Sequence, residues 1–337
     1  MKWTADVSAG DWLRARIDDP WAGTMHDIVP RGFTTYTRIF HPATRSKPAD
    51  GTAWPALPYE KNSRAWEEFT AAQHDIDTVA IRWHDAADAF GTRMHADAQW
   101  GALVRAAGDE WNPDGWQQVN GPDGWQYDAP GEGQLAAETL AAVMDTARAH
   151  TSTPHDGYIA VWEGWGGLVG GVGYGPARSI LTFTEDDEVT DATAKRHRDF
   201  LAASAKDLLN NVFRRPSWQP GILPDDVSKG PRLQLPNRGH VLFEGDPSAL
   251  ADPSWVLDAP WRDREMEQYG AQPSAESPSI IWPADRAWVM LSEVDWDSTI
   301  VAGSVELARA LCADPRIEAG IIREGAMLTW SSDEVNR

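Results

Sequence analysis

Apolar residues recur along this chain with two different periods. Runs rich in β-branched and aromatic residues indicate strands, over residues 32–41, 156–162, 179–183, 232–235, 240–245, 279–299 and 325–330. Apolar residues three and four positions apart indicate amphipathic helices, over residues 63–74, 84–90, 98–107, 134–150, 192–213 and 304–314. These elements alternate without a βαβ rhythm. We therefore expect an α+β fold, with a mixed or mostly antiparallel sheet and packed helices.

The chain has 337 residues, which is long enough for one large domain. We expect a single large α+β domain over residues 1–337, with a flexible arm or insertion at about residues 171–231. Four prolines within residues 42–60 predict that this stretch is a loop.

The segment 291–299, LSEVDWDST, carries Glu293, Asp295 and Asp297 at every second position. Alternate side chains of a strand share a face, so these carboxylates would lie about 7 Å apart along one face. Carboxylates this close repel one another, and at least one pKa rises unless a cation intervenes. The strip therefore allows a Mg²⁺ or Ca²⁺ site, an acid/base pair, neutralisation by arginines such as Arg286 and Arg82, or a solvated acidic face.

Tryptophan is the compositional outlier, with 19 copies. Most of them lie in apolar or strand-like runs, which favours a bulky core. Trp162, Trp165 and Trp282, together with Arg286, are the candidates for binding a ligand. The glycines that follow Trp162 fit a loop better than a dinucleotide-binding turn, because the breakers in residues 170–176 preclude the helix that such a turn requires.

Charge and composition argue against several classes of partner. The chain has 51 acidic and 30 basic residues, a formal net charge of −21, which repels phosphate backbones and anionic lipid. No stretch reaches the length that spans a bilayer, and residues 1–19 hold no apolar run of signal-peptide length. Cys312 is the single cysteine, so no internal disulfide forms. We expect a cytoplasmic protein that binds neither nucleic acid nor membrane.

No local motif identifies a reaction. The sequence has no Gly-x-Ser-x-Gly elbow and no P-loop. Neither His84 with His95 nor His150 with His155 has the spacing of a zinc framework. The sequence therefore specifies no cofactor or metal, and leaves open whether the chain is an enzyme.

Several segments together resemble a family of uncharacterised actinobacterial proteins: GDWLRARI, VPRGFTTYTRIFHPA, TPHDGYIAVWEGWG, LPNRGHVLFEG and SPSIIWPADRAWVMLSEVDWDSTIVAGS. The resemblance covers most of the chain outside about residues 171–231. It implies a bacterial, cytoplasmic origin, and it assigns no activity and no catalytic residue. It also groups WPADRAW and EVDWDST into one unit.

These observations favour a cytoplasmic binding or interaction protein whose partner is a small molecule or a protein. Its surface would combine tryptophans with the acidic strip. One alternative is a hydrolase of a sugar-like or other polar small substrate, with Glu293 and Asp295 or Asp297 as acid and base. That hydrolase needs a cleft joining residues 162–165 to the strip. The other alternative is a divalent-cation-binding protein that uses the same carboxylates.

Overall fold

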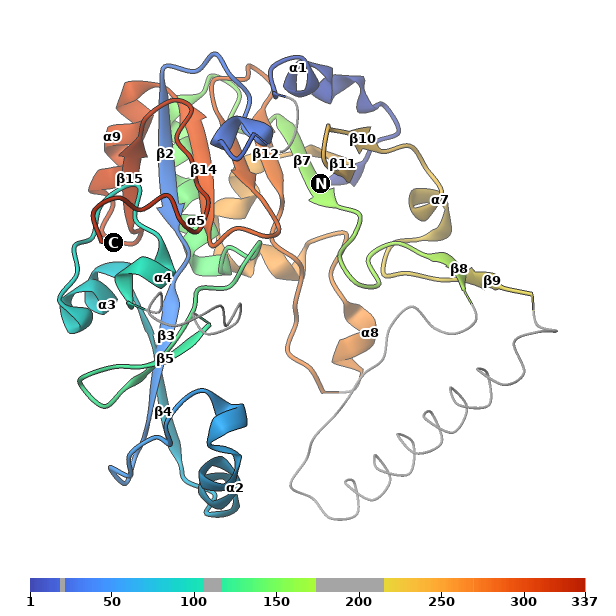
Figure 1. Ribbon diagram of the computed structural model, residues 1–337. Coiled ribbons are helices and arrows are strands. Elements are labelled where there is room, and N and C mark those ends of the chain that lie inside the picture. Colours follow the sequence, from blue (N-terminus) through green and yellow to red (C-terminus); the bar gives the residue numbers. More distant parts are fainter. Residues whose placement is uncertain (19–21, 106–116, 174–214, 269, 337) are drawn as a thin grey trace.

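The computed structural model describes residues 1–18, 22–105, 117–173, 215–268 and 270–336. Within these ranges a large sheet forms the body of the molecule, and a smaller sheet projects from it (Figure 1). The strand pairs of both sheets are antiparallel. Helices pack around the body sheet, so the expected α+β class with a mostly antiparallel sheet is confirmed.

The body sheet takes its strands from both ends of the chain. Its order is β1 (Lys2–Trp3), β11 (Gly239–Gly245), β7 (Gly157–Trp162), β12 (Ile280–Pro283), β13 (Val289–Ser292), β14 (Ser298–Gly303), β2 (Thr35–Phe40) and β15 (Ala319–Ile322), with β10 (Leu233–Gln234) paired to β11 outside this path.

The α-helices among the described residues are mostly short. They are α1 (Asp11–Arg14), α2 (Ser63–Ala71), α3 (Trp83–Phe90), α4 (Trp100–Leu103), α5 (Ala137–Ala147), α7 (Asp225–Ser228), α8 (Arg264–Glu267) and α9 (Val305–Ala313). Short 3₁₀ helices supplement them: η1 (Val7–Gly10), η2 (Met25–Asp27), η3 (Tyr59–Lys61), η4 (Arg148–His150), η5 (Pro247–Ala251) and η6 (Pro253–Leu257).

Alternate side chains of the body sheet enter two different hydrophobic cores. Ile159 and Val161 of β7 lie in the core that also contains Leu140 of α5. Ala160, between them, lies in the core of the opposite face, together with Trp12 of α1. Successive side chains of a strand point to opposite faces of the sheet, so each face of the body sheet packs against helices of its own.

The smaller sheet and α2 form a projecting lobe, which we define as residues 43–81 and 118–128. Its strand order is β4 (Ile76–Ile81), β3 (Ala43–Pro48), β6 (Gln126–Asp128) and β5 (Gln118–Asn120). β3 follows β2 after a two-residue break, so the lobe hangs from the body near β2 (Figure 1). A third core, with Trp83 of α3 and Trp100 of α4, packs where the lobe meets the body.

Several expectations about elements are wrong. The prolines within residues 42–60 do not exclude a strand, because β3 ends at one of them, Pro48. Residues 325–330 form no strand beyond a single bridge from Met327 to Thr24. In the described part of residues 98–107, which ends at residue 105, the expected helix is limited to α4.

The expected insertion at about residues 171–231 is described only at its ends. There β8 (Gly171–Gly173) pairs with β9 (Ser217–Gln219). The strand expected over residues 179–183 and the helix expected over residues 192–213 lie outside the described residues.

Candidate functional site

Glu293, Asp295 and Asp297 lie on a turn, not on a strand. β13 ends before residues 293–297 and β14 begins after them, and the two strands pair as a hairpin. Within the turn, Trp296 N–H donates to the Glu293 carbonyl at 3.1 Å. The expected acidic face is therefore wrong, because side-chain alternation stops where the chain reverses.

One guanidinium neutralises two of the three carboxylates. Arg238, in the turn between β10 and β11, donates through Nε to Glu293 and through a terminal nitrogen to Asp295, each at 2.5 Å. The side chain of Glu293 is 13% exposed and that of Asp295 is 75% exposed. Of the four alternatives, these two carboxylates show arginine pairing, and the partner is Arg238, not Arg286 or Arg82.

The third carboxylate pairs with a different arginine. Arg38 of β2 is fully buried, and it contacts Asp297 Oδ1 at 3.2 Å. Its other nitrogens donate to Ser298 Oγ at 2.8 Å and to the Ala98 carbonyl at 2.6 Å. Burial lowers the pKa of Arg38, and the Asp297 carboxylate opposes that shift. Arg38 therefore ties the turn to β2 and to the start of α4.

A buried chain of hydrogen bonds runs beside this ion pair. His41 Nδ1 lies 2.7 Å from the Gly131 carbonyl, which can only accept, so Nδ1 carries the proton. His41 Nε2 then accepts from Thr299 Oγ1 at 2.9 Å, and Thr299 accepts from Ser292 Oγ at 2.6 Å. Burial lowers the pKa of His41, which keeps the ring neutral in this arrangement.

The electrostatics of the turn suit an ion pair better than an acid/base pair. Burial raises the pKa of Glu293, and the Arg238 charge opposes the rise. Burial, followed by the charges of Asp297 and Asp295, raises the pKa of nearby Glu132. Each carboxylate of the turn already has a cation within 3.2 Å. A general acid and base would have to break these pairs before they could act.

Two of the candidate tryptophans do lie beside the turn. The Arg238 guanidinium lies 4.8 Å from the centre of the Trp162 ring, a cation–π contact. Trp165 meets Trp162 edge to face at 5.4 Å. The segment 162–165 and the acidic turn are therefore neighbours, and Arg238 fills the space between them.

The other two ligand-binding candidates both contact Trp12 of α1. Trp282 is fully buried, stacked on Tyr158 at 5.3 Å and edge-on to Trp12 at 6.2 Å. Arg286 lies 5.3 Å from the centre of the Trp12 ring. Both residues therefore pack on Trp12 of α1.

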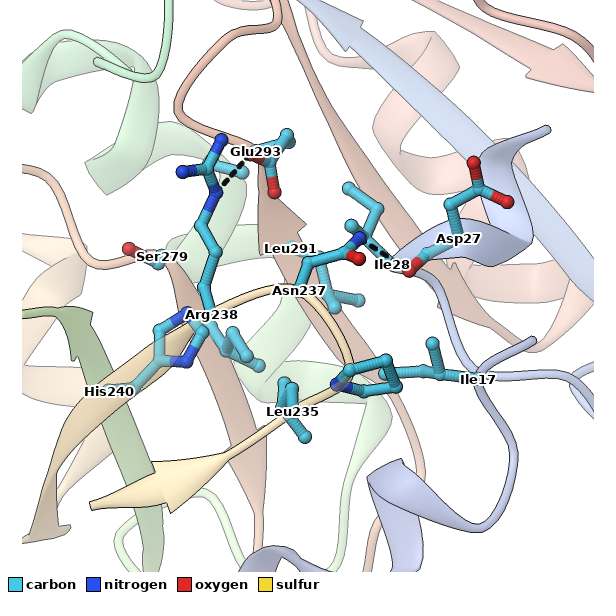
Figure 2. A pocket seen from close by; sticks show the side chains of 13 residues that line it. Ile17, Asp27, Ile28, Leu235, Asn237, Arg238, His240, Ser279, Leu291 and Glu293 are labelled. Atoms are coloured by element: carbon cyan, nitrogen blue, oxygen red, sulfur yellow. Dashed lines mark hydrogen bonds and ion pairs between the residues drawn. The ribbon is translucent and has the colours of Figure 1, made fainter. Parts of the chain in front are cut away.

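A small hollow lies under the turn that carries Arg238 (Figure 2). Its volume is about 20 Å³, which is room for one or two waters and too little for a sugar ring. Asn237 Nδ2 closes one side by donating to the Asp27 carbonyl at 3.1 Å. His240 also lines the hollow, and burial lowers the pKa of its ring to about 4.

A wider cleft lies between α3 and β15. Its volume is about 420 Å³, and Arg82, His84, His95 and Glu318 line it. The Glu318 carboxylate accepts the backbone N–H groups of Trp83 at 2.7 Å and of His84 at 2.9 Å. It therefore caps α3 and is not free to bind a ligand or a metal.

Strand β4 offers a surface that the sequence pattern did not single out. It is the edge strand of the lobe, and residues 76–80 are all exposed. Ile76 is 40% and Val79 is 42% exposed. Among the residues that the structure describes, β4 pairs with β3 alone. Within the described ranges, the side of β4 that faces away from β3 is therefore open to another strand.

The alternation of bonded and non-bonded residue pairs along the β3–β4 ladder shows which backbone groups face that free side. Ala49 N–H donates to the Asp75 carbonyl at 2.9 Å, so this pair is a bonded pair of the β3–β4 ladder. Bonded and non-bonded pairs alternate in antiparallel strands. Counting along the register from that pair, the N–H and C=O groups of Ile76, Thr78 and Ala80 point away from β3.

Comparison with protein-family models, curated proteins and solved structures finds no match to this chain. The resemblance to an actinobacterial family therefore stays a prediction. No helix in the described ranges is long and apolar enough to cross a membrane. Across the same ranges, no group of three or more His, Cys, Asp or Glu side chains could hold a metal ion.

Proposed function

We propose that this chain is a binding protein that recognises another polypeptide by strand addition at β4. The observation that carries the proposal is the free edge of β4, exposed on a lobe that projects from the body. An added strand gains main-chain hydrogen bonds, and the side chains that flank the edge select the partner.

The edge carries few of the devices that usually protect such strands. Natural edges are shortened, bulged, covered, or given prolines and lysines. β4 has six regularly paired residues, without proline or lysine. Asp77 is its single charged side chain, and it lies opposite Lys47 of β3. An edge of this kind is expected to be occupied by a partner.

The acidic turn supports this class of function over the two alternatives. Its carboxylates are paired with Arg238 and Arg38. The hollow beside it admits water but no sugar ring. The hydrolase and cation-site proposals both need free carboxylates at this position. A cytoplasmic location remains our expectation, because the single Cys312 gives the chain no internal disulfide.

Photo-crosslinking in the native cells tests the proposal. Val79 is replaced by p-benzoylphenylalanine, and Leu257 of η6, which is equally exposed, serves as the control position. We expect a covalent adduct with a polypeptide from position 79 and none from position 257. We also expect Thr78→Pro to abolish that adduct, because it removes an outward N–H group. No adduct from position 79 would overturn the proposed function.

A further inference from the structure

The geometry of β4 identifies its partner: we propose that the added strand is β4 of a second copy of this chain. This inference rests on the proposed function and names the polypeptide that is bound. It follows from the register in which the edge can pair with itself.

Antiparallel self-pairing requires the outward-facing residues of the two strands to lie opposite one another. A twofold axis at Thr78 meets this requirement for every outward residue. Thr78 then faces Thr78 of the second copy, and Ile76 faces Ala80 at both ends. Each of these pairs exchanges both of its N–H···O=C bonds, and the two lobes join into one continuous sheet.

The two neighbouring registers of self-pairing are less favourable than the one centred on Thr78. An axis at Asp77 places the two Asp77 carboxylates directly opposite each other, which is destabilising. An axis at Val79 leaves the outward groups of Ile76 without a partner within the strand. The axis at Thr78 instead places Asp77 opposite Val79, and a Thr–Thr pair at the centre is favourable. One register is therefore preferred, as a closed twofold dimer requires.

The side chains of the edge are compatible with this pairing. Ile76 and Val79 lie on opposite faces of β4, because their positions differ by an odd number. Each therefore gains a cross-strand neighbour on its own face. Lys47, opposite Asp77 on β3, offsets the carboxylate nearest to the axis. The contact is short, so we expect a reversible dimer that forms with rising concentration.

Sedimentation equilibrium over about 5–500 µM in 0.5 M NaCl measures the association directly. We expect the apparent mass to rise with concentration from that of one chain toward that of two. Thr78→Pro should remain a monomer throughout, since it removes an outward N–H group and no backbone bond to β3. The bond from Thr78 Oγ1 to Ser46 Oγ at 3.2 Å is lost both here and in the control below. Thr78→Val is the matched control. It keeps the backbone N–H and the β-branched shape, so it should still dimerise.

Hydrogen exchange gives a second readout that needs no variant. The amides of Asp77 and Val79 bond to β3 and should be protected at every concentration. The amides of Ile76, Thr78 and Ala80 should exchange quickly in dilute solution and slow down as the dimer forms. Equal protection at low and high concentration would overturn the proposal, and this holds even if Thr78→Pro fails to fold.

The outcomes separate the inference from the proposed function. The chain could stay monomeric at 500 µM and still crosslink from position 79 to a different polypeptide. That result would overturn the inference that the partner is a second copy, and it would leave the proposed strand addition in place. A monomer without any such crosslink overturns both. A dimer that Thr78→Pro leaves intact overturns β4 as the contact.

Discussion

Arg38 is the residue that ties β2 most directly to the acidic turn and to the residues before α4. Its guanidinium is fully buried and bonds Asp297, Ser298 and the Ala98 carbonyl. Arg38→Met leaves the Asp297 carboxylate and that carbonyl without their donor. Removing one partner of a buried ion pair costs about 3–5 kcal/mol. Urea unfolding at pH 7 should show a loss of this size in the free energy of unfolding.

A second arginine supplies the control for that measurement. Arg31 pairs with Asp18, but the side chain of Arg31 is 47% exposed and that of Asp18 is 34% exposed. Surface pairs of this kind contribute about 0–1 kcal/mol. Arg31→Met should therefore leave the unfolding midpoint nearly unchanged. Equal losses for the two variants would mean that burial of Arg38 is not what makes its contacts valuable.

At the scale of single residues, the sequence located the acidic segment but not its chemistry. Glu293, Asp295 and Asp297 are conspicuous because they recur within five positions. Their partners are not, because Arg38 lies 259 positions from Asp297 and Arg238 lies 55 positions from Glu293. Nothing in the local pattern around either arginine marks it as a partner. Long-range pairing of this kind depends on the strand order, which composition and periodicity do not specify.

The hairpin turn at residues 293–297 depends on a close approach by Gly133. Gly133 has φ +68° and donates its N–H to the Trp296 carbonyl at 2.8 Å. A Cβ at this position would lie 2.6 Å from the backbone of Val294. Gly133→Ala therefore combines backbone strain with a clash that no flexible side chain can relieve, and we expect a loss of about 1–3 kcal/mol. Thermal unfolding measures it.

Gly131, two residues earlier, is the matched control. A Cβ there meets nothing within 4 Å, and its φ lies outside the left-handed region. Gly131→Ala should leave the melting temperature within a degree or two of the wild type. A melting temperature for Gly133→Ala as high as for Gly131→Ala would contradict the role of this approach in holding the turn.

Elements were predicted best where one strong signal decided them. β2, β7 and α5 lie within their expected segments because long apolar patterns and clear breakers agree. The segment 279–299 carries β12 and β13, but its apolar–polar alternation continues through the hairpin turn, so the sequence pattern did not mark the end of β13. β3 was missed because its flanking prolines outweighed a weak strand pattern. Here ladder pairing with β4 and β6 decided the conformation.

For the whole molecule, a net charge of −21 sets the response to ions. Self-repulsion destabilises the compact state, and salt screens it within about 10 Å at 0.1 M. Thermal unfolding should therefore shift upward with NaCl. CaCl₂, MgCl₂ and MnCl₂ at matched ionic strength should add nothing further, since the turn carboxylates are paired with arginines. A larger shift with one divalent cation, absent in Asp295→Asn, would instead indicate a cation site at the turn.

The strand order also determines when each part of the molecule can form during synthesis. Among the described strands, β2 pairs only with β14 and β15. Arg38 cannot form its hydrogen bond to Ser298 until that residue, 260 positions later, has been synthesised. At about 5–20 residues per second, a ribosome needs roughly 10–50 s to supply that partner. The lobe needs nothing beyond residue 128 for its own sheet. A nascent chain can therefore complete the sheet that carries β4 while its body sheet still lacks most of its strands.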